Sequence, residues 1–281
     1  MKFFRFSLSI LMLFLLFSCT NSTNQSGEKE TTQSEEKVTE ITVQEIEYSA
    51  DTLDMTGYLA HPASPEAKLP GILIVHEWWG HTDYVRKRAE MLAELGYVAF
   101  ALDMYGEGRK ANHPGDAQKF SKMVMSNIGS AKDRFEAALD VLQASEHVDS
   151  TQIAAIGYCF GGSVVLSMAN AGYPMDAVAA FHSGVELPIP PSSKIKAKVL
   201  VANGAADPLI TEEQIKNFKS AMDSVNADYE YISYPNALHA YTNPIADSLG
   251  MKFELPLAYN ATADSLAWQE LQSLLKTTFK N

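Results

Sequence analysis

The chain has 281 residues, of which 46% are hydrophobic and 20% are charged, which is enough for one large domain with a full core. Its formal net charge at pH 7 is -12. Nucleic acid is excluded as a partner, because phosphate neutralisation needs clustered Lys and Arg and the chain shows no basic stripe.

The N-terminus has the pattern of a bacterial lipoprotein signal peptide over residues 1–18. Lys2 and Arg5 precede an apolar stretch, residues 8–17, that is too short to be a comfortable membrane span. Cys19 then follows a small residue, as does the cysteine that becomes the lipidated N-terminus of a lipoprotein. The alternative is an ordinary secretory signal with an incidental cysteine. We expect a protein that is exported from the cytoplasm and lipid-anchored through Cys19 to a membrane of the cell envelope.

Residues 19–39 are Ser, Thr, Asn, Gln, Glu and Lys with almost no apolar side chain. Such a segment cannot bury a core, so it is predicted to be a flexible tether, and the folded domain is expected over residues 40–281. Cys19 and Cys159 are the two cysteines of the chain, so a lipidated Cys19 leaves Cys159 without a disulfide partner. A free thiol in an exported protein is a liability unless it is used or well buried.

Strands and helices alternate through the predicted domain. Residues 41–48 and 53–60 alternate apolar and polar side chains, which predicts an antiparallel hairpin at a sheet edge. Further strands are expected at 71–76, 97–102, 153–156, 177–182, 198–203 and 229–234. Helices are expected at 82–95, 114–127, 130–144, 163–169, 211–224 and 262–279. The alternation predicts a single α/β domain with a mostly parallel sheet covered by helices on both faces.

The segment Gly157-Tyr158-Cys159-Phe160-Gly161-Gly162 joins a predicted strand to a predicted helix. Glycines two residues before and two after a central residue allow a sharp reversal, which leaves the central side chain exposed near the helix N-terminus. The helix dipole and the free N–H groups at that end favour a thiolate on Cys159 and help to hold an oxyanion. On these residues alone, a glycine-rich turn around a buried structural cysteine is an equally good interpretation.

Loops after three other predicted strands carry Glu77, Asp207 and His239, and such loops form the site of an open α/β sheet. The order Cys159, Asp207, His239 is that of nucleophile, acid and base in an α/β-hydrolase. We interpret Cys159 as the attacking thiolate, His239 as base and later acid, and Asp207 as the group that orients the imidazole. Taken singly, Asp207 is more typical of a turn and His239 of a solvated loop, so the joint pattern carries the hypothesis.

Several short segments share a joint pattern: His76-Glu77-Trp78-Trp79-Gly80, Gly96-Tyr97-Val98-Ala99, Leu102-Asp103-Met104-Tyr105-Gly106, residues 157–162, Asp207-Pro208, His239-Ala240-Tyr241 and Ala267-Trp268. Through them the chain, from about residue 40 to the C-terminus, resembles the dienelactone hydrolase family of α/β-hydrolases. The resemblance implies the α/β-hydrolase fold and a hydrolase of small esters or lactones that needs no cofactor. The alternative from another class is an α/β-hydrolase-fold binding or stress protein of the cell envelope that has lost turnover.

The resemblance also implies roles for other residues. Glu77 matches a carboxylate that contacts the nucleophilic thiol and takes part in its activation, although most loop glutamates are merely solvated. The backbone N–H groups of the family's oxyanion hole correspond to Trp78 and Phe160. The expected substrate-binding residues are Trp79, Arg109 and Tyr241.

Family members that open dienelactone bind its carboxylate with two arginines, and here this chain departs from the pattern. Glu107 stands where the first arginine would align, Arg109 comes two residues late, and no arginine follows His239 closely. Because a bidentate arginine fork recognises a carboxylate well, the sequence predicts a preference for neutral substrates. Arg86 and Arg88, on a predicted helix, are interpreted as solvated charges.

No metal site is expected, because His76, His81, His113 and His182 show no metal-ligand spacing. The expected partner is a small-molecule ester or lactone, and the expected membrane contact is through the lipid anchor. The sequence predicts no particular oligomeric state.

Overall fold

The structure is a computed structural model that describes residues 39–279. The expected signal peptide, Cys19 and nearly all of the expected tether lie outside the described residues. Within residues 39–279, none of the helices combines the length and the apolar character that crossing a membrane requires.

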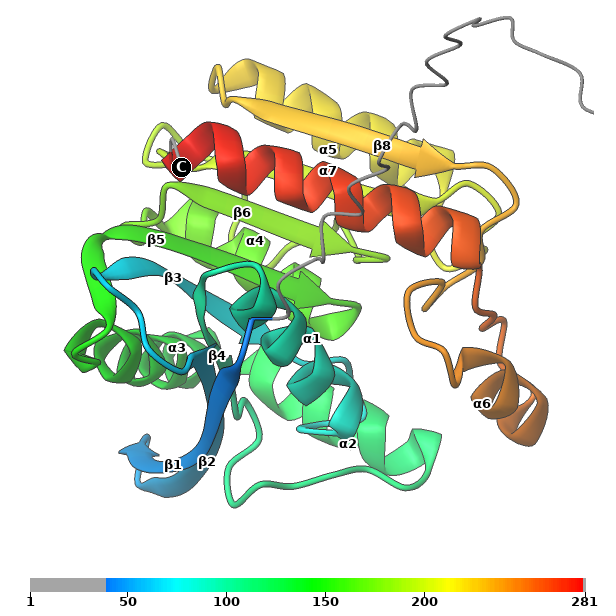
Figure 1. Cartoon of the computed structure of the whole chain (residues 1–281). Helices are drawn as coiled ribbons and strands as arrows, with labels where there is room; N and C mark the ends of the chain where they lie inside the picture. The colour runs from blue at the N-terminus through cyan, green and yellow to red at the C-terminus, as the bar shows by residue number, and fades with distance from the viewer. Residues whose placement is uncertain (1–38, 280–281) are drawn as a thin grey trace, which may run out of the picture. The chain divides into compact units, whose positions relative to one another are not determined.

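An eight-stranded sheet forms the centre of the fold (Figure 1). Its strands are β1 (Ile41–Ala50), β2 (Leu53–Pro62), β3 (Leu69–Val75), β4 (Val98–Leu102), β5 (Val148–Tyr158), β6 (Ala177–Phe181), β7 (Lys198–Gly204) and β8 (Tyr229–Tyr234). Their spatial order is β1-β2-β4-β3-β5-β6-β7-β8. The strands from β4 to β8 in this order are parallel, whereas β1 and β2 pair antiparallel and form the edge hairpin. The predicted hairpin and the mostly parallel sheet are therefore confirmed.

Helices cover both faces of the sheet. They are α1 (Asp83–Glu94), α2 (Pro114–Ser126), α3 (Ile128–Ala144), α4 (Phe160–Ala171), α5 (Glu212–Ser224), α6 (Ala246–Phe253) and α7 (Ala261–Phe279). Helices α1 and α7 pack on one face, and α3, α4 and α5 pack on the other (Figure 1). Side chains of β3 alternate between the two cores, with Ile72 and Ile74 in one and Leu73 and Val75 in the other. Burial on both faces explains why this strand is continuously apolar.

Helix α6 was not predicted from the sequence. It has eight residues, Gly250 interrupts them, and its N-cap Ile245 makes no side-chain hydrogen bond to the helix. Neither composition nor capping therefore marks the segment as a helix. The ring of Phe253 in α6 stacks on Trp79 with the centroids 5.8 Å apart, which buries Trp79.

Close backbone contacts fix the turn from β5 to α4. Cys159, the N-cap of α4, has φ of 55°, in the left-handed region that non-glycine residues rarely adopt. A Cβ on Gly157 would lie 2.2 Å from the carbonyl oxygen of Gly161, and one on Gly161 would lie 2.3 Å from that of Val75. No side chain fits at either position. The sharp strand-to-helix reversal expected around Cys159 is therefore present.

Candidate active site

The side chains of Cys159, His239 and Asp207 meet at the carboxyl ends of the parallel strands. Cys159 follows β5, Asp207 follows β7 and His239 follows β8. The Nδ1 atom of His239 is 2.7 Å from Oδ2 of Asp207, and its Nε2 atom is 3.1 Å from Sγ of Cys159. A carboxylate only accepts hydrogen bonds, so Nδ1 carries a proton and Nε2 faces the sulfur. Cys159, His239 and Asp207 thus form one hydrogen-bonded series. In the chain, His239 lies 80 positions after Cys159 and 32 positions after Asp207.

This series is largely closed to water. The side chain of Asp207 is 0% exposed and that of His239 is 9% exposed. Burial alone would lower the pKa of His239, but the negative charges of Cys159 and Asp207 and their hydrogen bonds outweigh burial and raise the pKa well above its usual range. A raised pKa of His239 favours the imidazolium form of this side chain.

A cavity of about 430 Å³ opens at Cys159. Its apolar wall comes from Trp78, Met125, Phe160, Leu209 and Ile210. One face of α2 contributes Gln118, Ser121, Lys122 and Met125, which are spaced three and four residues apart. Among the described residues that line the cavity, no side chain is a carboxylate, and Lys122 is the only lysine or arginine.

Two residues that line the cavity at Cys159, Trp78 and Phe160, have backbone N–H groups that make no hydrogen bond within residues 39–279. The carbonyl of Glu77 accepts hydrogen bonds from Nδ1 of His76 at 2.6 Å and from the N–H of Gly80 at 3.1 Å. Because a trans peptide points its C=O and N–H in opposite directions, the Trp78 N–H is turned away from these contacts. Both N–H groups are free to donate to an oxyanion.

Glu77 binds Asn243 rather than the thiol. Its Oε2 atom accepts a hydrogen bond of 2.6 Å from Nδ2 of Asn243, whereas the sulfur of Cys159 faces His239. The Oδ1 atom of Asn243 accepts from the N–H of Ile245 at 3.1 Å, so the amide must present Nδ2 to Glu77. The expected contact between Glu77 and the sulfur is therefore replaced by an amide contact. No arginine follows His239 closely in the sequence, and no sequence pattern predicts a site role for Asn243.

The charge state of Glu77 is set by its surroundings. Glu77 and Asn243 are both buried. Burial raises the pKa of Glu77 to about 7, against the opposing effects of the Asn243 hydrogen bond and the positive charges of His239 and Arg88. A buried carboxyl with one hydrogen-bond donor favours the neutral acid in this way. Glu77 therefore changes charge near neutral pH.

The three expected substrate-binding residues do not line the cavity at Cys159. Trp79 is buried beneath α6, which the sequence did not predict. Arg109 forms an ion pair of 2.8 Å with Glu107 at the surface. Tyr241 is fully buried, and its hydroxyl donates to the carbonyl of Ala202 at 2.9 Å. Each of the three side chains is held by another part of the chain and lies outside the lining of this cavity, and their contact with substrate stays a prediction.

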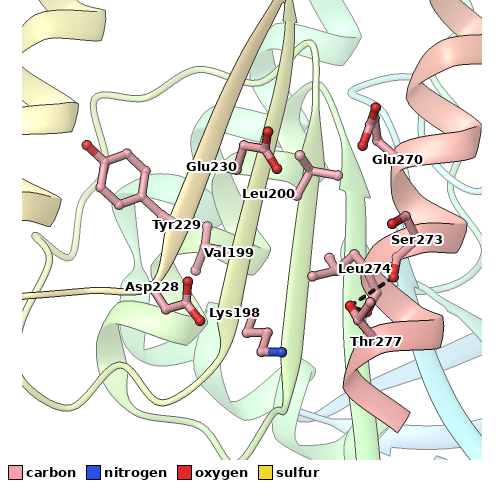
Figure 2. A pocket seen from close by; sticks show the side chains of 10 residues that line it. All are labelled: Lys198, Val199, Leu200, Asp228, Tyr229, Glu230, Glu270, Ser273, Leu274 and Thr277. Carbon is pink, nitrogen blue, oxygen red and sulfur yellow. Dashed lines mark hydrogen bonds between the residues drawn. The ribbon is translucent and has the colours of Figure 1, made fainter. Parts of the chain in front are cut away.

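A second cavity, of about 440 Å³, lies between β7, β8 and α7 (Figure 2). Lys198, Asp228, Glu230 and Glu270 supply its charged groups. Its lining includes no cysteine or histidine, so it lacks a nucleophile with an adjacent base. Elsewhere in the described part of the chain, no three His, Cys, Asp or Glu side chains are grouped so that they could hold a metal ion. The candidate active site is therefore the cavity at Cys159.

The model of the dienelactone hydrolase family matches residues 55–279, which is most of the chain and includes every residue of the Cys159 site. The chain belongs to the dienelactone hydrolase family. As a member of this family it is a hydrolase of carboxylic esters or lactones with the α/β-hydrolase fold.

Named relatives cover most of the chain. The protein usf of Aquifex pyrophilus is 27% identical over 207 residues, which are 71% of this chain and 87% of that protein. A Saccharolobus solfataricus protein named "Putative carboxymethylenebutenolidase" is 25% identical over 269 residues, with 84% of this chain and 99% of that protein covered.

Solved structures of related proteins agree with the fold. The protein in the structure of m3DLH is 32% identical in sequence to this chain, and the two structures match with a TM-score of 0.80. The match covers 85% of this chain and 98% of the m3DLH chain. A dienelactone hydrolase-like promiscuous phosphotriesterase from metagenomic libraries is 30% identical with a TM-score of 0.79, again with 85% and 98% of the two chains covered. These dienelactone hydrolase-like folds match the described domain nearly from end to end.

The buried carboxyl of Glu77 predicts a pH dependence of stability. Its pKa is raised on folding from 4.5 to about 7, so the stabilisation by its bound proton is fully present below pH 4.5 and is lost as pH rises through 7. Glu77→Gln keeps an acceptor for Asn243 and cannot ionise. We expect the unfolding free energy of this variant, relative to wild type, to rise by about 3 kcal/mol between about pH 4 and about pH 8.

Urea denaturation of both proteins at the two pH values measures this difference. Glu66→Gln, which removes an exposed carboxyl, is the matched control and should track wild type at both values. If the difference between Glu77→Gln and wild type stayed constant with pH, Glu77 would not change charge near neutrality.

Proposed function

We propose that this chain is a thiol-dependent hydrolase that cleaves small esters or lactones by acyl transfer through Cys159, with His239 as base and Asp207 as its orienting acid. The observation that carries the proposal is the unbroken hydrogen-bonded series of these three side chains, 2.7 and 3.1 Å long, at the wall of a largely apolar cavity. Membership of the family supplies the reaction class, and the geometry supports the role of each residue.

In the first half-reaction the thiolate of Cys159 attacks the carbonyl carbon of the bound ester. A C–S bond forms, and the electron pair of the C=O bond moves to oxygen. The free N–H groups of Trp78 and Phe160 are suited to stabilise this oxyanion. When the oxyanion collapses, the C–O bond to the leaving group breaks, and Nε2 of His239 gives its proton to the departing alkoxide. The acyl group remains on sulfur as a thioester.

In the second half-reaction water releases the acyl group. His239, now neutral, takes a proton from water at Nε2, and the hydroxide formed attacks the thioester carbon. Collapse of this second intermediate breaks the C–S bond, which frees the acid and restores the thiolate beside the imidazolium. Throughout, Asp207 holds Nδ1–H and so keeps Nε2 directed at the sulfur. Each step uses groups of the chain and water, so the proposal calls for no cofactor.

The catalytic assignment predicts a non-additive set of variants. Cys159→Ala and His239→Ala should each lower kcat on a 4-nitrophenyl ester by about 10³-fold or more, and the double variant should be scarcely worse than either. Groups that act as one unit lose their effect together. Asp207→Asn should also be severe, because it spoils the orientation of the imidazole.

Cys19→Ser is the matched control, because it removes the other cysteine of the chain and should keep full hydrolysis. Circular dichroism of each variant checks the fold. If Cys159→Ala kept most of the hydrolysis, the nucleophile would be wrongly assigned. If wild type turned over none of a panel of small aryl esters and lactones, a binding or stress protein would be the better interpretation.

The lining of the cavity predicts selectivity for neutral substrates. Arg109 is paired with Glu107 at the surface, and Lys122 is exposed, so neither supplies a buried fork for a carboxylate. We expect kcat/KM for 4-nitrophenyl pentanoate to exceed that for the 4-nitrophenyl monoester of glutaric acid by about tenfold, because the carboxylate must lose water at an apolar wall. A preference for the anionic ester that disappears in Lys122→Met would contradict this and assign anion binding to Lys122.

We also propose that the mature protein begins at a lipidated Cys19 and is held at the cell envelope by residues 19–39. The support is the signal-like sequence before Cys19 and the polar composition after it, both in a part of the chain that the structure does not describe. Intact-mass analysis of protein extracted from membranes should show an N-terminal Cys19 with added acyl mass. A mature N-terminus elsewhere, without acyl mass, would refute the anchor.

A further inference from the structure

Arg88 is a buried residue of α1. Its place on a predicted helix is typical of a solvated charge, but only 5% of its side chain is exposed. Its Nη2 atom is 2.5 Å from Oδ1 of Asp264 at the start of α7. Its guanidinium carbon lies between 5.3 and 5.6 Å from the ring centroids of Tyr84, Tyr158 and Trp268. Arginine suits such a site because its planar cation is weakly hydrated and stacks on aromatic rings.

The same guanidinium holds the backbone of the loop that carries His239. Nη2 of Arg88 donates a hydrogen bond of 2.7 Å to the carbonyl oxygen of Thr242, three residues after His239. Arg88 therefore ties α1, α7 and the His239 loop together at one point. A buried ion pair such as that between Arg88 and Asp264 often adds little net stability, because both charges lose their water. We therefore look to the contact with the His239 loop for the role of Arg88.

The side chain of Thr242 extends this contact towards His239. Its Oγ1 atom is 2.5 Å from the hydroxyl of Tyr84 and 2.8 Å from Nε2 of His182. The ring of His182 is fully buried and packs edge-to-face on the ring of His239, with the centroids 5.3 Å apart. Burial, together with the positive charges of His239 and Arg88, lowers the pKa of His182, so it packs there as a neutral ring.

We propose that Arg88 is a positioning residue for His239: through Thr242 it fixes the loop after β8, and through Thr242 and His182 it fixes the imidazole that faces Cys159. The inference rests on the proposed function, since it takes His239 to be the base. Nε2 of His239 is 3.1 Å from the sulfur, a direct contact whose geometry depends on the position of the loop that carries His239. Misplacement by about 1 Å can cost about 100-fold in rate.

The test separates positioning from stability by removing both charges of the ion pair. Arg88→Met alone leaves Asp264 without its partner, whereas Arg88→Met with Asp264→Leu replaces the pair by apolar side chains, a change that folded proteins often tolerate. In the full chain, both variants should lower kcat on 4-nitrophenyl pentanoate by about 100-fold with KM within about threefold of wild type. Urea denaturation places each variant on a common stability scale.

A second measurement reports on the sulfur itself. Iodoacetamide reacts with the thiolate, so the alkylation rate of Cys159, followed by peptide mass spectrometry, should fall in both variants because His239 no longer takes up its proton. The matched control is Arg86→Met on the same helix, whose guanidinium pairs with Glu45 at 2.7 Å outside this cluster. Both kcat and the alkylation rate of the control should stay within about twofold of wild type.

Thr242→Val tests the same chain of contacts without disturbing the ion pair. It keeps the carbonyl that Arg88 binds and removes the hydroxyl between Tyr84 and His182. We expect kcat to fall by about tenfold, with slower alkylation of Cys159. This variant keeps the proposal testable if the Arg88 variants do not fold.

Two results would overturn the proposal. One is a double variant as stable as wild type that regains wild-type kcat and alkylation rate, since Arg88 would then serve stability alone. The other is an unchanged kcat and alkylation rate in a folded Thr242→Val. A failure of the proposed function looks different, because Cys159→Ala would then retain hydrolysis whatever the Arg88 variants do.

Discussion

The approach of α4 to the strand ends of β3 and β5 is the constraint on which the rest of the site depends. Gly161 lies so close to the carbonyl of Val75 that no Cβ fits, and Gly157 lies equally close to the carbonyl of Gly161. Because the chain reverses within this space, Cys159 is forced to a positive φ at the first turn of α4. The same reversal leaves the N–H of Phe160 without an acceptor in the described chain. The positive φ of Cys159 and the unpaired N–H of Phe160, to which the proposed function assigns the nucleophile and an oxyanion donor, therefore follow from one steric condition.

The three buried histidines around Cys159 differ in their affinity for a proton. Nε2 of His76 accepts from the N–H of Met104 and Nδ1 donates to the carbonyl of Glu77, and burial lowers the pKa of His76 to about 4, so this ring is neutral. His182 is neutral for the same main reason. Of the buried rings near the sulfur, His239 has carboxylate and thiolate partners that raise its pKa. His239 is thus the buried imidazole whose surroundings suit the acid–base role that the proposed function gives it.

Sequence reasoning succeeded where one local rule decides the structure. Alternating and continuous apolar runs predicted the strands from β1 to β8, and the glycine spacing around Cys159 predicted the reversal that Gly157 and Gly161 form. The loops after β5, β7 and β8 could be expected to meet because parallel strands end at one edge of a sheet. That Cys159, Asp207 and His239 meet at one edge of the sheet could therefore be predicted from the sequence, and their roles as nucleophile, acid and base stay a proposal.

It failed where the partner of a side chain decides its role. Arg88 looks like any helix arginine until α7 brings Asp264 to it, and the contact spans 176 positions of the chain. Trp79 was expected to contact substrate, but it is covered by α6, a helix that its Gly250 and its lack of a capping side chain leave without a helical signal in the sequence. The amide orientation of Asn243 follows from a hydrogen bond to Ile245 that no sequence pattern marks. Such roles depend on tertiary contacts, which periodicity and propensity do not encode.

The pairing of Glu77 with Asn243 shows how one such contact changes the electrostatics of the site. An arginine at that place would hold Glu77 as a permanent carboxylate, whereas a neutral amide leaves burial as the dominant influence and raises the pKa to about 7. A protonated Glu77 adds no negative charge to a site that also contains the side chains of Asp207 and Cys159. The two positive charges near Glu77 have other partners. His239 contacts Asp207 and Cys159, and Arg88 forms an ion pair with Asp264. With an amide as its partner, Glu77 is neutral below its pKa and adds no negative charge near the sulfur. As pH rises through 7 Glu77 ionises, so the electrostatics of the site change with pH.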